Sequence, residues 1–75
     1  MITKEIRRQC PDYLDANFER HLEAYVLAED PVLRTQKDAR LRTDLNHIRR
    51  RTPYHIFEAY YSVYQGIVLN ERTQR

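Results

Sequence analysis

Apolar residues recur at helical spacing along most of the chain. The first set, spaced by four, four and three residues, is Leu14, Phe18, Leu22 and Tyr25. The second set is Leu41, Leu45 and Ile48, and the third and most apolar set is Ile56, Tyr60, Val63, Tyr64 and Ile67. Residues at such intervals share one face of an α-helix. The pattern predicts helices over about 11–29, 32–51 and 53–66, preceded by a helical turn at about 3–9. The expected fold is all-α, a small three-helix bundle.

Each proline stands where one of these helices begins. Proline suits the first helical turn, because the N–H it lacks would have no partner within the helix there. In Asp30-Pro31 and Thr52-Pro53 a capping side chain precedes the proline, which is a typical start signal. Cys10-Pro11-Asp12 is a weaker form of the same signal, in which Asp12 supplies an acid to the first turn.

The start of the second helix and the end of the third helix can each be placed in two ways. Arg34 falls on the apolar face of the second helix, so its regular part starts either near Pro31 or later, with Thr35 as its cap. In the later case Val32 and Leu33 would form a turn tucked under the bundle. Gly66 either ends the third helix in a left-handed cap, followed by an extended tail, or lies inside a helix that continues to Asn70.

Length and composition indicate one small domain over 1–75. The chain has 75 residues, with one Gly, three Pro and one Cys, so an internal disulfide framework is excluded. Its longest uncharged stretch is the 12 residues from Ala59 to Asn70, whereas a bilayer span needs roughly 18–20. We therefore expect an intracellular, cytoplasmic protein with no membrane segment and with a frayed tail over 71–75.

Charge is segregated along the chain, although its net value is only +2. Residues 11–30 hold six acids and one Arg, while residues 31–51 hold seven cations and two acids. Eleven of the thirteen cations are Arg, whose planar donors match phosphate and carboxylate groups. An acidic first helix and a basic second helix are therefore expected to attract each other.

The outer face of the second helix carries no acid. Its polar residues with binding potential are Arg40, Arg42, Asn46, His47, Arg49, Arg50 and Arg51, while Asp38 and Asp44 fall at the borders of the apolar stripe. Such a face is typical of a helix that contacts phosphates or an acidic partner. The alternative is an intrachain role. The acidic ladder Asp15, Glu19 and Glu23 would then pair across the hairpin with Lys37, Arg40 or Arg51.

No pattern of catalytic or metal-binding residues is present in the sequence. The histidines lie one per helix without paired spacing, and a single Gly excludes a phosphate-binding loop. We expect no enzyme activity, no cofactor and no metal. His21 is expected to pack, His55 to be solvated and Cys10 to be a capping or half-buried thiol. A helix-turn-helix over 38–66 is excluded, because the helix after the Arg51-Thr52-Pro53 turn is mostly apolar.

The third helix gathers aromatic side chains, and Tyr is enriched at protein interfaces. The predicted protein interface is Tyr54, Phe57, Tyr60, Tyr61, Tyr64 and Val68; the alternative is that these residues form the core. The sequence thus favours a small non-enzymatic regulator, adaptor or inhibitor that binds another protein, or a second copy as a homodimer. The alternative function is nucleic-acid binding by the basic helix, ranked second because such modules usually have a pI above about 9.

Overall fold

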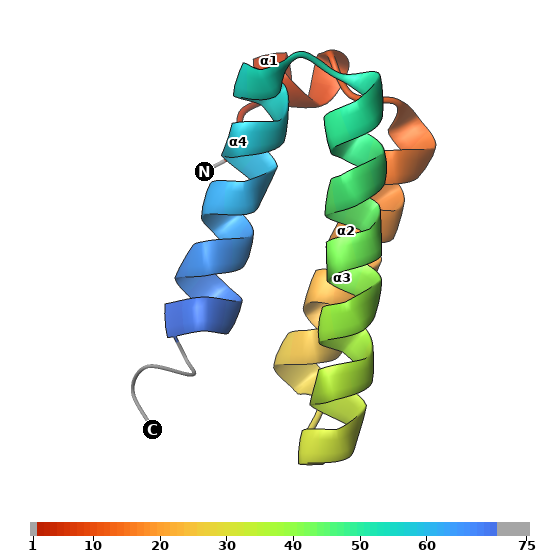
Figure 1. Ribbon diagram of the computed structural model, residues 1–75, viewed down its shortest axis with the longest axis vertical. Coiled ribbons are helices and arrows are strands. Elements are labelled where there is room, and N and C mark those ends of the chain that lie inside the picture. Colours follow the sequence, from red (N-terminus) through yellow and green to blue (C-terminus); the bar gives the residue numbers. More distant parts are fainter. Residues whose placement is uncertain (1, 71–75) are drawn as a thin grey trace.

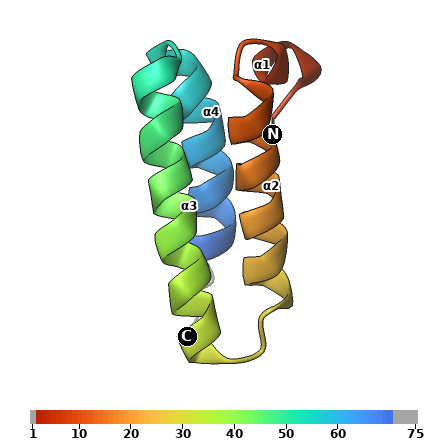
Figure 2. The ribbon, with the colours of Figure 1, turned by 90° about the vertical axis from the view of Figure 1, so that its right-hand side faces the viewer.

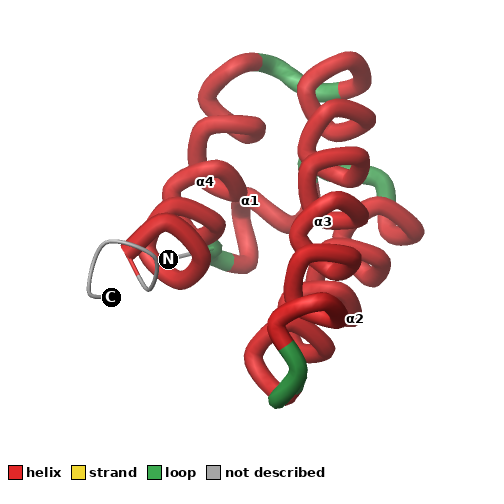
Figure 3. Tube along the Cα trace, turned by 60° about the horizontal axis from the view of Figure 1, so that its bottom comes forward, coloured by secondary structure: helices red, strands yellow, loops and turns green. Residues whose placement is uncertain are grey.

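Helices account for most of residues 2–70, which are the residues that the computed structural model describes. The elements in chain order are α1 (Lys4–Arg8), α2 (Asp12–Leu27), α3 (Pro31–Arg51), α4 (Tyr54–Tyr64) and the π-helix η1 (Gln65–Leu69). No strand occurs among the described residues, and only short connections separate the helices (Figure 3). The predicted all-α bundle is confirmed, with helix bounds within two residues of those expected for α2, α3 and the start of α4.

The helices form a hairpin and a returning helix. Helices α2 and α3 run antiparallel, and α4 returns alongside them after the turn at Thr52 and Pro53 (Figure 1). The short helix α1, which corresponds to the predicted turn at 3–9, lies across the end of the bundle where α2 begins (Figure 2). The tail 71–75, predicted to fray, lies outside the described residues.

The predicted starts of α3 and α4 are both correct, but the predicted side-chain cap forms only at α3. The Asp30 carboxylate accepts a hydrogen bond of 2.9 Å from the Val32 N–H and caps α3, with Pro31 in the first turn. The later start at Thr35 is therefore wrong, and Val32 and Leu33 are 65% and 39% exposed rather than tucked under the bundle. Thr52 does not cap α4; its hydroxyl donates 2.6 Å back to the Ile48 carbonyl and serves the end of α3.

Gly66 does not end the last helix. It lies in the π-helix that continues α4 to Leu69, and its φ is not positive, so the left-handed cap and the extended tail are both wrong. The Asn70 N–H donates to the Gln65 carbonyl, which is the five-residue step of a π-turn. The predicted alternative of a helix continuing toward Asn70 is the one observed.

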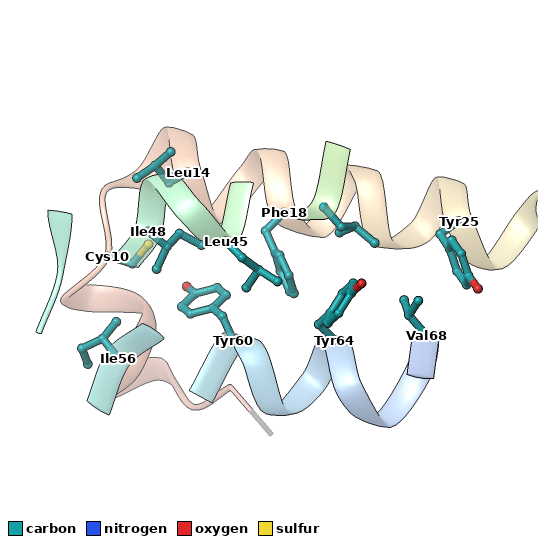
Figure 4. Close-up of a cluster of buried hydrophobic side chains, with 11 residues drawn as sticks. Cys10, Leu14, Phe18, Tyr25, Leu45, Ile48, Ile56, Tyr60, Tyr64 and Val68 are labelled. Atoms are coloured by element: carbon teal, nitrogen blue, oxygen red, sulfur yellow. The ribbon is translucent and has the colours of Figure 1, made fainter. Parts of the chain in front are cut away.

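The core lies where the apolar stripes of α2, α3 and α4 meet. Phe18 is fully buried, and its ring meets the ring of Tyr60 edge to face at 5.2 Å between centroids. Figure 4 shows Tyr60 and Tyr64 projecting from α4 toward α2, with Phe18 projecting back. Cys10 is buried in the same cluster rather than half-buried. Burial raises the pKa of its thiol, so Cys10 acts as a packing residue.

A carboxylate accepts or shares a short hydrogen bond between each pair of the three long helices. Between α2 and α4, Tyr60 donates 2.7 Å to the half-buried Asp15. Between α3 and α4, Tyr64 donates 2.6 Å to Asp38, and between α2 and α3 the His21 Nδ1 lies 2.5 Å from an Asp44 oxygen. Asp38 and Asp44 are buried, so the polar borders of the α3 stripe are part of the interior. His21 packs as expected, and in addition it binds Asp44.

Two members of the acidic ladder, Asp15 and Glu19, pair with α1 and not across the hairpin. Arg7 lies 2.5 Å from Glu19 and 3.7 Å from Asp15. The cation that pairs with these acids therefore comes from α1, whereas a cation of α3 was predicted. Arg51 reaches α2, but it donates to the Tyr13 hydroxyl rather than to a carboxylate. The prediction of ion pairs from Asp15 and Glu19 to α3 is therefore wrong, because α1 folds back over the start of α2.

Candidate functional site

An open groove of about 480 Å³ lies between α3 and α4. The two helices diverge from the turn at Thr52 and Pro53, so that α4 and η1 stand away from α3 toward the far end (Figure 1). The lining residues are Arg42, Thr43, Leu45, Asn46 and Arg49 from α3, Phe57, Tyr61 and Tyr64 from α4, and Leu69 from η1. Hence one wall is polar and basic, and the other is aromatic.

The basic wall consists of Arg42, Asn46 and Arg49, which follow one another at intervals of four and three residues. This spacing places them on one face of α3, and all three are exposed. None of the described residues that line the groove is an acid. The groove is therefore a site of positive charge in a protein whose net charge is only +2.

The aromatic wall is a continuous row of rings. Phe57 and Tyr61 stack with centroids 5.6 Å apart, and Tyr61 lies 5.9 Å from Tyr64. The guanidinium carbon of Arg49 lies 5.9 Å from the Phe57 centroid, a cation–π contact that joins the two walls. Phe57 and Tyr61 are half-buried, so they present apolar area that the fold itself leaves uncovered.

Beneath the groove a buried carboxylate holds the walls together. Tyr64 donates to Asp38, while the Arg42 Nε donates 3.2 Å to the Tyr64 hydroxyl and its Nη2 lies 3.4 Å from Asp38. Burial, and secondly the bond to Asp38, raise the pKa of Tyr64, so its hydroxyl stays protonated and donates. Arg42 is thereby fixed in orientation, because it binds both members of the pair.

The π-helix brings a last apolar residue to the groove. In a π-turn the hydrogen bond spans five residues, whereas in an α-turn it spans four. Leu69 therefore lies on the same side of the helix as Tyr64, five residues earlier, and lines the groove with it. Such turns occur frequently at functional sites. Neither Leu69 nor the wider turn was predicted, because nothing in the sequence of η1 distinguishes it from an ordinary helix end.

The predicted aromatic interface divides into two groups. Phe57 and Tyr61 line the groove, and Tyr54 is 67% exposed at the start of α4, with its ring 5.9 Å from that of Phe57. Tyr60, Tyr64 and Val68 are buried in the core, so they have little surface to offer a partner. For these three the alternative of a core role, also drawn from the sequence, is the observed placement.

The predicted basic set does not gather into one patch. Arg42, Asn46 and Arg49 line the groove, whereas Arg51 turns to Tyr13 on α2, with its guanidinium carbon 5.8 Å from that ring. The remaining members are exposed elsewhere: Arg40 beside a second hollow with His21 and Asp44, and His47 and Arg50 outside both hollows. His55 is exposed, as expected.

Asp38 was not predicted to be part of this site. A signal for Asp38 was present, since it precedes Leu41, Leu45 and Ile48 at helical spacing and so falls on the inward face. What the sequence could not supply was its partner, because Tyr64 is 26 residues away.

The described residues form neither a metal-binding cluster nor a membrane-spanning helix. Within residues 2–70 no three His, Cys, Asp or Glu side chains lie close enough to hold a metal ion. No helix of that part combines the length and the apolar character needed to cross a bilayer. Comparison with protein-family models, curated proteins and solved structures gives no match.

Proposed function

We propose that this protein is a small non-enzymatic regulator or adaptor that binds another protein through the groove between α3 and α4. The observation that carries the proposal is the meeting of two residue sets in one open groove. Arg42, Asn46 and Arg49 face Phe57 and Tyr61 across it. The protein has a single cysteine, Cys10, which is a buried free thiol, as is usual in a reducing compartment. We therefore propose that the protein acts in the cytoplasm.

The chemistry of the groove favours a protein ligand. Tyr, Phe and Arg are enriched at protein interfaces, and a few such residues in a partly desolvated pocket supply most of the binding energy. Here the aromatic wall supplies apolar area, while Arg49 supplies a charge beside it. Arg42 is held by Tyr64 and Asp38, so binding a partner costs little additional ordering of that side chain.

Nucleic-acid binding is the second candidate function. The basic wall favours it, because a cationic groove lined with aromatic rings is also the pattern of single-strand binders. Two observations rank it lower. Phe57 is already in contact with both Tyr61 and Arg49, which leaves it less ring face for a base. In addition, Arg51 contacts Tyr13 on α2 and Arg40 lines the second hollow, so neither adds to the charge of the groove.

A matched pair of variants tests the proposal. The groove variant is Asn46→Glu with Arg49→Glu, and the control is His47→Glu with Arg50→Glu, one residue further along α3. Both pairs are exposed and make the same change in charge, but only the first lines the groove. A photo-crosslinking residue at Thr43, which also lines the groove, is introduced into each chain.

The expected result is a protein adduct formed in cells by the parent and the control chains and lost in the groove variant. Equal adducts from all three chains would overturn the proposal. In parallel, fluorescence anisotropy with labelled single-stranded RNA and duplex DNA is measured at several salt concentrations. Binding that falls steeply with salt and disappears only in the groove variant would instead assign the groove to nucleic acid.

A further inference from the structure

A second surface, the hairpin tip (residues 26–33), is left apolar by the fold. It connects α2 to α3 at the end of the molecule remote from α1 (Figure 1). Val26 is 54% and Leu27 is 70% exposed, and Val32 and Leu33 beside them are also exposed. These four aliphatic side chains lie within eight residues of one another and expose apolar area that burial against a partner would remove from water.

Hydrogen bonds hold the hairpin tip in one shape, and the charged side chains within it are acidic. Arg34 donates 2.6 Å from its Nε to the Ala28 carbonyl, and Asp30 caps α3, so the connection is held in one shape. Glu29 and Asp30 are exposed within the tip and Glu23 is exposed one turn before it, while Arg34 is the nearest cation. A shape fixed before binding loses less entropy when it docks.

The tip and the groove are complementary in chemistry. The groove has an aromatic wall and two Arg with no acid among its described lining residues, whereas the tip has aliphatic side chains flanked by carboxylates. We propose that the hairpin tip of one copy of this protein docks into the α3–α4 groove of a second copy. Leu27 and Val32 would then cover the aromatic wall, and Glu29 would face Arg49. This proposal rests on the proposed function only in taking the groove as a protein-binding site.

The two surfaces are different, so the contact is heterologous. A chain with a defective tip still offers an intact groove, and a chain with a defective groove still offers an intact tip. Mixing the two defective chains therefore restores one complete contact that neither can form alone. This complementation separates tip-in-groove docking from any contact in which like surfaces meet.

The experiment is sedimentation velocity of the full chain between about 10 µM and 1 mM, since a contact of this size is expected to be weak. The tip variant is Leu27→Gln with Val32→Gln, two exposed positions. The groove variant and its control are those described above. Circular dichroism on each variant establishes that its helices are retained.

The expected result is self-association of the parent and control chains, weakened by about 100-fold in the tip variant and in the groove variant. An equimolar mixture of the two defective variants should form a dimer. Failure of the mixture to associate, or self-association unaffected by either variant, would overturn the proposal. A parent chain that stays monomeric to 1 mM would also overturn it. The proposed function would survive that result if the crosslink at Thr43 still captured another protein.

Discussion

Helix α3 is in contact with α2 on one side and α4 on the other, and the two contacts differ in kind. Toward α2 its polar residues are satisfied within the chain, since Asp44 binds His21 and Arg51 binds Tyr13. Toward α4 buried Asp38 and exposed Arg42 bind Tyr64, while Asn46 and Arg49 line an open groove. The side of α3 that faces α2 thus stabilises the fold, while the side that faces α4 has exposed polar residues that are available for binding.

The largest expected difference between these sides concerns two phenylalanines. Phe18 on α2 is fully buried, so Phe18→Ala should cost about 3–5 kcal/mol of unfolding free energy. Phe57 is half-buried on the groove wall, so Phe57→Ala should cost about 1–2 kcal/mol, because less area is lost. Urea unfolding followed by circular dichroism measures both losses. Equal losses would mean that the groove wall is core and not a binding surface.

High pH should remove the stability that the two buried tyrosines contribute to the fold. Burial, and secondly hydrogen bonds to carboxylates, raise the pKa values of Tyr60 and Tyr64 above their usual range. The folded state then holds protons that the unfolded state releases above about pH 10. Their stabilisation is therefore complete below that pH and is lost as the pH rises toward the folded values.

The expected slope is up to about 1.4 kcal/mol per pH unit for each of the two tyrosines. Urea midpoints measured at successive pH values above about 10 give this slope. The double variant Tyr60→Phe with Tyr64→Phe should flatten it. A slope that is unchanged in the double variant would show that other groups cause the loss of stability.

A smaller effect is expected when the Tyr64 hydroxyl alone is removed. Tyr64→Phe leaves buried Asp38 without its 2.6 Å donor, so we expect a loss of about 1–3 kcal/mol in unfolding free energy. The loss should be partly recovered when Asp38→Asn is added, because a neutral amide tolerates the site better than a carboxylate. If the two changes simply add, Tyr64 and Asp38 are not coupled.

The smallest effect is expected from a second Tyr→Phe substitution, at Tyr13 on the α2 side of α3. Tyr13 is 54% exposed, and its hydroxyl accepts a hydrogen bond from Arg51 in water. Tyr13→Phe should therefore change the unfolding free energy by no more than about 0.5 kcal/mol. Differential scanning calorimetry alongside Tyr64→Phe makes the comparison direct. A loss as large as that of Tyr64→Phe would mean that the exposed contact also supports the α2–α3 side.

Local features of the fold could be predicted from the sequence, because they depend on neighbouring residues. The stripe that contains Leu14 and Phe18, and the cap formed by Asp30, follow from spacing and side-chain chemistry within one helix. Thr52 shows the limit of this reasoning. Thr52 also precedes a proline, but its hydroxyl donates to the Ile48 carbonyl at the end of α3 and does not cap α4. A hydroxyl between two helices can hydrogen-bond to either one.

The site could be predicted only in part, because it depends on how the helices cross. Both residue types of the groove were identified, as Arg49 on one helix and Tyr61 on another, yet they were assigned to competing functions. Only the packing of α4 against α3 shows that they line one groove. The same packing buries Tyr60, which spacing had placed on the apolar stripe but which was also predicted to belong to the interface.

The hydrogen bonds between the long helices also have a topological consequence. Three antiparallel helices can close as either of two mirror arrangements, with the last helix on one flank or the other of the first hairpin, and apolar stripes are compatible with both. Here Asp15 on α2 and Asp38 on α3 each accept from a different tyrosine of α4, four residues apart. On the opposite flank half-buried Asp15 and buried Asp38 would each lose a tyrosine donor, and a hydrogen bond to a charged group contributes about 1.5–3 kcal/mol. These two hydrogen bonds therefore favour the observed handedness of the bundle, while the burial of apolar side chains drives folding.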